Sequence, residues 1–206
     1  MSRWFAPGTW SYALPLLLVA GPLMWFSPAG GAGTALAGIA ILYFHRDPDR
    51  NVPESGFVSP ADGTVSVLRE EDGRLRVGVF MNLHHVHVNR APTPGRIEAV
   101  THSPGAHRPA FSKESDRNER VHVDFPEYRV TLIAGAFARR IHPHVAVDDS
   151  VNRGERIGHI SFGSRVDVLF PPSVTRSDLE VERGEPVRAG ETILASDQDS
   201  RSRTGA

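Results

Sequence analysis

The hydrophobic and polar positions divide the chain into two parts that meet near residue 45. Residues 4–44 form an unbroken run of 41 residues without Asp, Glu, Lys, Arg or His, whereas residues 45–206 hold 46 of the 47 Asp, Glu, Lys and Arg side chains. A helix needs roughly 20 apolar residues to cross the hydrocarbon core of a bilayer. We therefore predict a membrane anchor over residues 1–45, followed by a polar domain.

The uncharged run can form two helices, over residues 4–26 and 29–44, separated by the Ser-Pro-Ala-Gly-Gly sequence at residues 27–31. This pattern predicts a helical hairpin. The second segment has only 16 residues, so both a hairpin that crosses the bilayer twice and one that inserts more shallowly remain open. A signal peptide is the poorer interpretation, because the run is too long and no A-x-A cleavage site ends it.

Positive charge flanks the anchor at Arg3, Arg46 and Arg50. Loops on the cytoplasmic side of a membrane protein carry an excess of Lys and Arg. We therefore expect a protein of the cell membrane whose polar domain lies on the cytoplasmic side.

The polar domain has the pattern of a mainly β fold. Short runs with alternating apolar positions are separated by Gly, Pro and Asp, which is typical of strands joined by turns. The Asp-Gly pairs at residues 62–63 and 72–73 predict hairpin-type turns, and a few short helices are expected, the best candidate being residues 135–141. The predicted strands cover residues 64–68, 75–80, 121–125, 129–133 and 165–170.

A weak internal repeat relates residues 151–158 to residues 181–187 through a shared V-x-x-G-x-x-V/I spacing. This spacing suits a strand, a tight turn and a second strand, as in barrels of the lipoyl type, and it suits two ordinary hairpins equally well. The fold class is therefore mainly β, barrel-like or sandwich-like. We expect the domain to cover residues 46–196 and the polar tail at 197–206 to be disordered.

Composition excludes several chemistries. The chain has no cysteine, which excludes disulfides, a thiolate nucleophile and Cys-ligated metal sites. Lys113 is the only lysine among 23 basic residues, so an enzyme with a lysine Schiff base would have to use it. A net charge of −1 argues against a nucleic-acid partner, which would call for a basic stripe.

Three histidines lie close together at His84, His85 and His87. If this run is a strand, His85 and His87 share one face and could bind zinc, with a third ligand from His142, His144 or Asp62. Ordinary hydrogen-bonded histidines explain the run more simply. Asp62 alone reads as a turn residue or as an acid that orients a histidine, and the Gly163-Ser164 pair alone reads as a turn.

Taken together, ordered sequence blocks over residues 46–171, behind the hydrophobic hairpin, resemble the short form of phosphatidylserine decarboxylase proenzymes. The matching blocks are Arg46-Asp47-Pro48, Ser59-Pro60-Ala61-Asp62-Gly63, Phe80 with His87-Val88-Asn89-Arg90-Ala91-Pro92, Pro104-Gly105, Asn118-Glu119-Arg120, Ile133-Ala134-Gly135 with Ala138-Arg139-Arg140-Ile141, and Arg156-Ile157-Gly158 with Phe162-Gly163-Ser164-Arg165-Val166-Asp167.

The resemblance implies a self-processing decarboxylase. Ser164 would attack the carbonyl of Gly163, and the chain would divide into residues 1–163 and 164–206, which stay together as a heterodimer. Ser164 would become a covalent pyruvoyl cofactor. In the family pattern Asp62 and His87 activate this serine, and His84 matches a histidine of the long form for which a proton-transfer role is open.

A pyruvoyl carbonyl forms a Schiff base with the substrate amine and acts as the electron sink for decarboxylation. It therefore needs neither pyridoxal phosphate, nor a protein lysine, nor a metal. The resemblance implies a substrate with a serine headgroup, phosphatidylserine or archaetidylserine, and the hairpin would hold the site against the bilayer. Homo-oligomerisation stays open. The alternative from another class is a membrane-anchored β-barrel module that binds a metal or a partner through its histidines.

Overall fold

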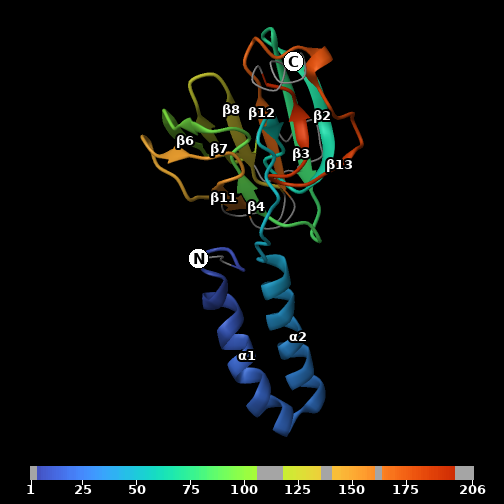
Figure 1. The fold of residues 1–206 in the computed structure, drawn as a ribbon. Coiled ribbons are helices and arrows are strands. Elements are labelled where there is room, and N and C mark those ends of the chain that lie inside the picture. The colour runs from blue at the N-terminus through green and yellow to red at the C-terminus, as the bar shows by residue number, and fades with distance from the viewer. Residues whose placement is uncertain (1–3, 106–117, 136–140, 161–163, 198–206) are drawn as a thin grey trace. The chain divides into compact units, whose positions relative to one another are not determined.

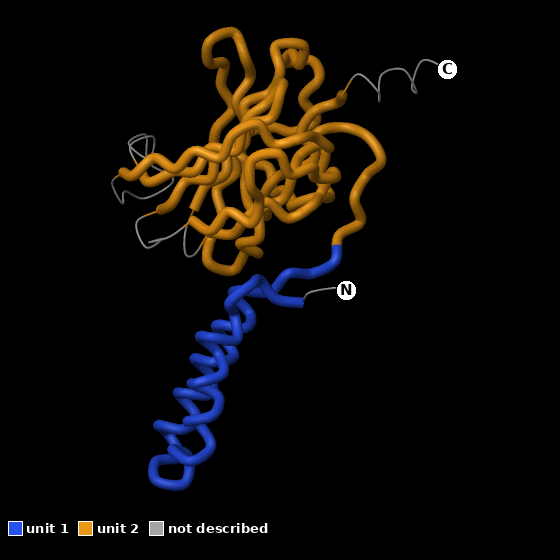
Figure 2. Tube along the Cα trace, turned by 90° about the vertical axis from the view of Figure 1, so that its left-hand side faces the viewer, with its two compact units in different colours: residues 1–49 blue, residues 50–206 orange. Residues whose placement is uncertain are grey.

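The computed structural model describes residues 4–105, 118–135, 141–160 and 164–197. The chain separates into two compact units, Met1–Asp49 and Arg50–Ala206, which Figure 2 colours separately. Gly163, Lys113 and the tail from residue 198 lie outside the described residues.

The first unit is a helical hairpin of α1 (Thr9–Phe26) and α2 (Pro28–Phe44), which lie side by side in Figure 1. The predicted hairpin is confirmed, but the break at residues 27–31 is shorter than expected. Only Ser27 separates the helices, and its Oγ accepts a hydrogen bond of 3.3 Å from the Gly30 amide. Proline is well tolerated in the first turn of a helix because that N–H has no intrahelical acceptor.

Small residues allow the two helices to approach closely. A Cβ atom on Gly31 would lie 2.4 Å from Met24 Cα, and one on Gly38 would lie 2.7 Å from Leu17 Cδ2. The outward side chains are large and apolar, among them Trp25 and Phe26, which are 88% and 84% exposed. By length and composition α1 is a candidate membrane span, while α2 is apolar but shorter.

In the described part of the second unit, the regular elements are all strands apart from one 3-10 turn, which confirms the predicted mainly β fold class. The strands are β1 (Phe57–Val58), β2 (Gly63–Glu71), β3 (Arg74–Met81), β4 (Val88–Arg90), β5 (Gly95–Arg96), β6 (Ala99–Ser103), β7 (Arg120–Asp124), β8 (Arg129–Ile133), β9 (Ile141–Pro143), β10 (Ser150–Val151), β11 (Arg156–Ile160), β12 (Ser164–Leu169), β13 (Pro186–Val187) and β14 (Ile193–Ala195), with a 3-10 turn at Arg176–Asp178.

Seven strands form the main antiparallel sheet, in the order β13-β2-β3-β12-β8-β7-β6 (Figure 1). A three-stranded sheet, β4-β11-β9, contributes Ile157 and Ile160 to the same apolar core as Val79, Leu132 and Val166. The two smaller sheets pair β1 with β14 and β10 with β5. Because both larger sheets share one core, residues of β4 and β11 lie near one face of the main sheet.

The five predicted strand windows are confirmed as β2, β3, β7, β8 and β12, and those at residues 121–125 and 165–170 extend one residue beyond the end of β7 and β12. The Asp72-Gly73 pair forms the predicted β2–β3 hairpin turn, with both residues at positive φ. The Asp62-Gly63 prediction was wrong, because Gly63 already belongs to β2. Glycine is required there for close approach, since a Cβ would lie 2.1 Å from the Phe80 carbonyl oxygen.

The weak repeat marks a turn that occurs twice. In each copy a glycine has positive φ, Gly154 at 73° and Gly184 at 96°. In each copy a glutamate carboxylate accepts from the backbone amide three residues earlier, at 2.8 Å for Glu155 and 2.9 Å for Glu185. The flanking strands pair elsewhere, β10 with β5 and β13 with β2, so neither copy is a hairpin.

The histidine-rich run and the helix expected over residues 135–141 are the two other local predictions. Residues 82–87 are not a strand, so the strand face that His85 and His87 were expected to share does not arise, and the strand begins only at Val88. Most of the helix expected over residues 135–141 lies outside the described residues, and Ile141 itself begins β9.

Candidate active site

Ser164 is the first residue of β12, in the middle of the main sheet. Its register partner on β3 is Met81, and both residues are fully buried. Strand alternation places Ser164 on the same face as Val166 and Val168, which belong to the core. Among the described residues, none forms a hydrogen bond with Ser164 Oγ. The serine named by the sequence is therefore a buried hydroxyl at the end of a central strand.

His87 lies directly before β4 and is 3% exposed. Its Nδ1 is 2.9 Å from the carbonyl oxygen of His85. Because a carbonyl only accepts, Nδ1 carries the hydrogen of the neutral ring, and Nε2 keeps a lone pair that can take a proton. The backbone of His87 also binds β11, since its carbonyl accepts from the Ile160 amide at 3.2 Å.

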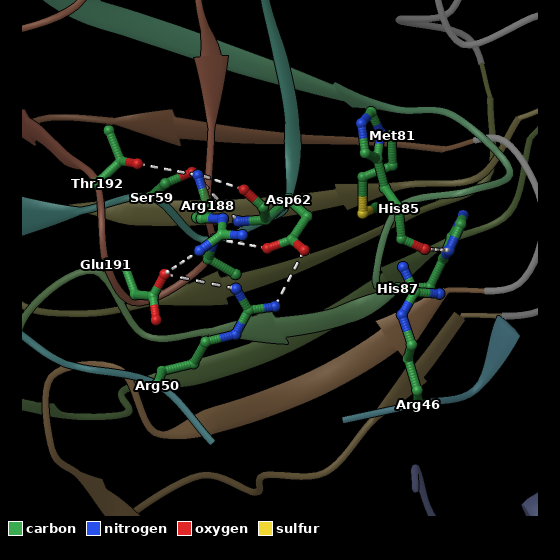
Figure 3. A network of polar contacts seen from close by, with 12 residues as sticks. Arg46, Arg50, Ser59, Asp62, Met81, His85, His87, Arg188, Glu191 and Thr192 are labelled. Atoms are coloured by element: carbon green, nitrogen blue, oxygen red, sulfur yellow. Dashed lines mark hydrogen bonds and ion pairs between the residues drawn. The ribbon is translucent and has the colours of Figure 1, made fainter. Parts of the chain in front are cut away.

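Met81 connects the surroundings of His87 with those of Ser164. Asn89, two residues after His87, donates from Nδ2 to Met81 Sδ at 3.6 Å, and Met81 is the cross-strand partner of Ser164. Figure 3 draws Met81 together with His85 and His87, and the dashed line there joins the His85 carbonyl to His87. The fold thus brings residues about 80 positions apart in sequence to one buried place.

Asp62 lies between β1 and β2 and has other neighbours. One carboxylate oxygen accepts from Arg50 Nη2 at 3.0 Å, and the other accepts from the Ala189 amide at 2.8 Å. Arg50 Nη1 is also 3.8 Å from Glu191 Oε2. Figure 3 shows Asp62 facing Arg50, with His87 on the other side of the view. The described contacts of Asp62 therefore do not include His87.

Arg50 was missed as a site residue by sequence reasoning, which counted it only as a positive charge beside the anchor. Its side chain is 5% exposed, and that of Asp62 is 14% exposed. Arg50 and Asp62 are 12 residues apart in the sequence, and only the folded structure brings them together. No local motif could therefore have identified the pair.

The opposite face of β12 carries a buried ion pair. Arg165 binds both carboxylate oxygens of Asp167, at 2.7 Å and 3.0 Å, and Arg76 lies 3.6 Å away on β3. A Cβ on the neighbouring Gly78 would lie 2.6 Å from Asp167 Oδ1. A bidentate pair of this kind holds the strand that begins with Ser164 rigidly.

The remaining candidate histidines do not join His87. His84 is exposed, and its ring centre is 4.1 Å from that of His85. His142 stacks on His159, whose Nδ1 is 2.8 Å from His144 Nε2. Across residues 4–105, 118–135, 141–160 and 164–197, no three His, Asp or Glu side chains are placed to hold a metal ion.

A cavity of about 1080 Å³ lies beyond the other end of β12. Its lining includes Phe57, Tyr128, Arg153 and Pro171. Burial raises the pKa of Tyr128, whose hydroxyl donates to the Thr93 carbonyl at 2.9 Å. At about 3.3 Å per strand residue this cavity lies roughly 20 Å from the Ser164 end of the strand, so it is not part of the candidate site.

Comparison with known proteins identifies the class. A family model described as phosphatidylserine decarboxylase matches residues 38–195. A Halobacterium salinarum protein named "Putative archaetidylserine decarboxylase proenzyme" is 60% identical over 191 residues, covering 92% of this chain and 97% of that protein. A phosphatidylserine decarboxylase proenzyme of Thermobifida fusca is 46% identical over 203 residues, covering 93% and 92%. No solved structure matches the chain.

The β fold, the apolar hairpin and these matches define a membrane-associated carboxy-lyase that is made as a proenzyme. The chain belongs to the phosphatidylserine decarboxylase family. Members act on phosphatidylserine or archaetidylserine, and the decarboxylase expected from the sequence is confirmed.

Proposed function

We propose that this chain cleaves itself between Gly163 and Ser164 and then uses a pyruvoyl group made from Ser164 to remove CO₂ from a serine-headgroup phospholipid. The supporting observation is the position of Ser164: a buried hydroxyl at the start of a central strand, linked through Met81 to the segment that carries His87. The ethanolamine lipid is the product, and phosphatidylserine and archaetidylserine share the reacting headgroup.

Self-cleavage begins when Ser164 Oγ attacks the carbonyl carbon of Gly163 and His87 Nε2 takes the hydroxyl proton. The C–N bond between the residues breaks, and the proton passes to the Ser164 nitrogen, which leaves an ester. Loss of the Ser164 Cα proton then breaks the Cβ–Oγ bond and frees the Gly163 carboxylate. Water converts the dehydroalanine at the new N-terminus into the pyruvoyl group and ammonia. A serine hydroxyl needs such an adjacent base because it is otherwise a weak nucleophile.

The surroundings of Ser164 fit the group that it would become. The pyruvoyl carbonyl supplies the electron sink that decarboxylation requires, without a lysine from the protein. The face of β12 that carries Ser164 packs into the core, so water has little access to it. His87, with its hydrogen on Nδ1, can hold a proton at Nε2 close to this position.

Asp62 has a positioning part in this proposal. In the family pattern it belongs with His87, and here its charge is held by Arg50 and by the Ala189 amide. This ties the turn before β2 to the turn before β14, beside the strands that support the site. His84 is exposed, and its part in catalysis rests on the resemblance alone.

Intact mass spectrometry of the purified protein tests the proposal. We expect two chains, residues 1–163 and 164–206, with the smaller one blocked by pyruvoyl, and CO₂ release from at least one of the two lipids. Ser164→Ala should remain one chain and be inactive. His87→Ala and Asp62→Ala should slow the cleavage. A single uncut chain in active material would refute the pyruvoyl mechanism.

The proposed orientation puts the decarboxylase domain in the cytoplasm. Because the chain has no cysteine, a single Ser173→Cys substitution on the exposed surface of that domain gives one labelling site. In intact cells this site should be protected from a membrane-impermeant maleimide and should become reactive after permeabilisation. Labelling of intact cells would place the domain outside. Ser27→Cys at the hairpin tip, if labelled from outside, would show two crossings.

A further inference from the structure

Asn89 is a buried polar residue that the self-cleavage chemistry above does not use. It lies in β4 with its side chain fully buried, and Nδ2 donates to the weak acceptor Met81 Sδ at 3.6 Å. Its Oδ1 is also buried and forms no hydrogen bond with any residue in the described parts of the chain. A buried acceptor left without a hydrogen bond destabilises the fold, because its desolvation is not compensated.

A donor without a partner lies beside it. Ser164 and Met81 are register partners on adjacent antiparallel strands, so their side chains project from the same face with Cβ atoms roughly 4.5–5.5 Å apart. Asn89 contacts the far end of the Met81 side chain. Within residues 4–105, 118–135, 141–160 and 164–197, Ser164 Oγ likewise forms no hydrogen bond. Two buried polar atoms without a hydrogen bond, Asn89 Oδ1 and Ser164 Oγ, therefore both lie next to Met81.

His87 lies two residues before Asn89, directly ahead of β4. The backbone of this segment is held on β11, since Asn89 pairs with Gly158 and the His87 carbonyl accepts from Ile160. Pairing with β11 therefore fixes the backbone of both Asn89 and His87, the proposed base.

We infer that Asn89 is a positioning residue for self-cleavage. Its Oδ1 and Ser164 Oγ are not hydrogen-bonded to each other in this structure of the uncut chain; rotation of the two side chains beside Met81 lets Oδ1 accept the Ser164 hydroxyl hydrogen before the attack and hold Oγ on the core-facing side of β12. The hydrogen then transfers to His87 Nε2 as the Oγ–carbon bond forms and the peptide C–N bond breaks. The advantage is orientation, because misplacing a nucleophile by about 1 Å can cost on the order of 100-fold in rate. This inference rests on the self-cleavage proposed above.

Two substitutions separate positioning from support of the fold. Asn89→Leu keeps the branching at Cγ and removes both polar atoms, although leucine is the larger residue, whereas Asn89→Asp keeps an acceptor in place of Oδ1. Because the leucine variant no longer buries an unsatisfied acceptor but must fit a larger side chain, its melting temperature should stay close to that of the parent when both carry Ser164→Ala. Asn82→Ala, on the exposed turn of the same segment, is the matched control.

The readout is the rate of appearance of the two chains by intact mass, with and without hydroxylamine, which cleaves the ester but not the amide. We expect Asn89→Leu to cleave at least tenfold more slowly without accumulating ester, Asn89→Asp to cleave faster than the leucine variant, and Asn82→Ala to match wild type. The inference is overturned if Asn89→Leu cleaves at the wild-type rate, if its melting temperature falls in step with its rate, or if the aspartate variant is equally slow. Failure of the wild type to cleave at Gly163–Ser164 would instead refute the proposed function.

Discussion

The ion pair between Arg50 and Asp62 should be one of the strongest single electrostatic contributions to the second unit. We consider Asp62→Asn, which keeps the shape of the side chain and removes its charge, and Arg50→Met, which keeps an apolar stem of similar length. Both substitutions are placed in the Ser164→Ala chain, so that every variant is compared as one uncut polypeptide.

The magnitude follows from burial. The two side chains are 3.0 Å apart and only 5% and 14% exposed. Removing one partner of a buried pair costs about 3–5 kcal/mol, because the other charge stays desolvated. Glu191, at 3.8 Å, still compensates Arg50 when Asp62 is replaced, so we expect about 3 kcal/mol for Asp62→Asn. For a chain of this size, that corresponds to a fall in melting temperature of roughly 6–12 °C.

A double-mutant cycle measured by thermal and urea unfolding isolates the pair. The double variant should lose less than the sum of the single variants, with a coupling of about 2–3 kcal/mol. The matched control is Arg96 and Asp148, whose atoms are also 3.0 Å apart but whose side chains are 66% and 71% exposed. There we expect less than about 1 kcal/mol. Additive single losses at Arg50 and Asp62, or equal couplings for the two pairs, would refute the reasoning.

Two further outcomes follow from local geometry. Gly63→Ala should lower the melting temperature much more than Gly73→Ala. A Cβ at residue 63 would lie 2.1 Å from the Phe80 carbonyl oxygen, whereas a Cβ at residue 73 meets no atom and is disfavoured only by the φ of 72°. Equal losses in melting scans would contradict this. Burial and the nearby Arg129 lower the pKa of His122. The unfolded chain therefore binds this proton more readily, so stability should fall as pH drops below about 6.5, and His122→Gln should flatten that fall in melting temperatures measured from pH 7.5 to 5.5.

The strands and the hairpin could be predicted because their signals are local. Alternation over residues 129–133 and 165–170 matches β8 and β12, and the uncharged run matches α1 and α2. The wrong prediction has a non-local cause. Asp62-Gly63 has the composition of a hairpin turn, but Gly63 is needed where β2 passes the Phe80 carbonyl, a contact that appears only when β2 and β3 pair.

The candidate site divides in the same way. Ser164, His87 and Asp62 could be named from ordered sequence blocks, and the family that those blocks indicated is confirmed. The contacts of these residues could not be predicted from the sequence. The His85 carbonyl sets the tautomer of His87, and Arg50 holds Asp62, although neither has a sequence signal that distinguishes it from its neighbours.

The sequence by itself determined the apolar helical hairpin, the β class and the family, because hydrophobic periodicity, charge and residue identity are properties of single segments. Only the tertiary structure decided which segments meet: β3 beside β12, so that Met81 faces Ser164, and β4 on β11, so that Asn89 reaches Met81. The physical reason is that strand pairing and burial join residues far apart in the chain, and a buried polar atom reveals its partner, or its lack of one, only after that packing is complete.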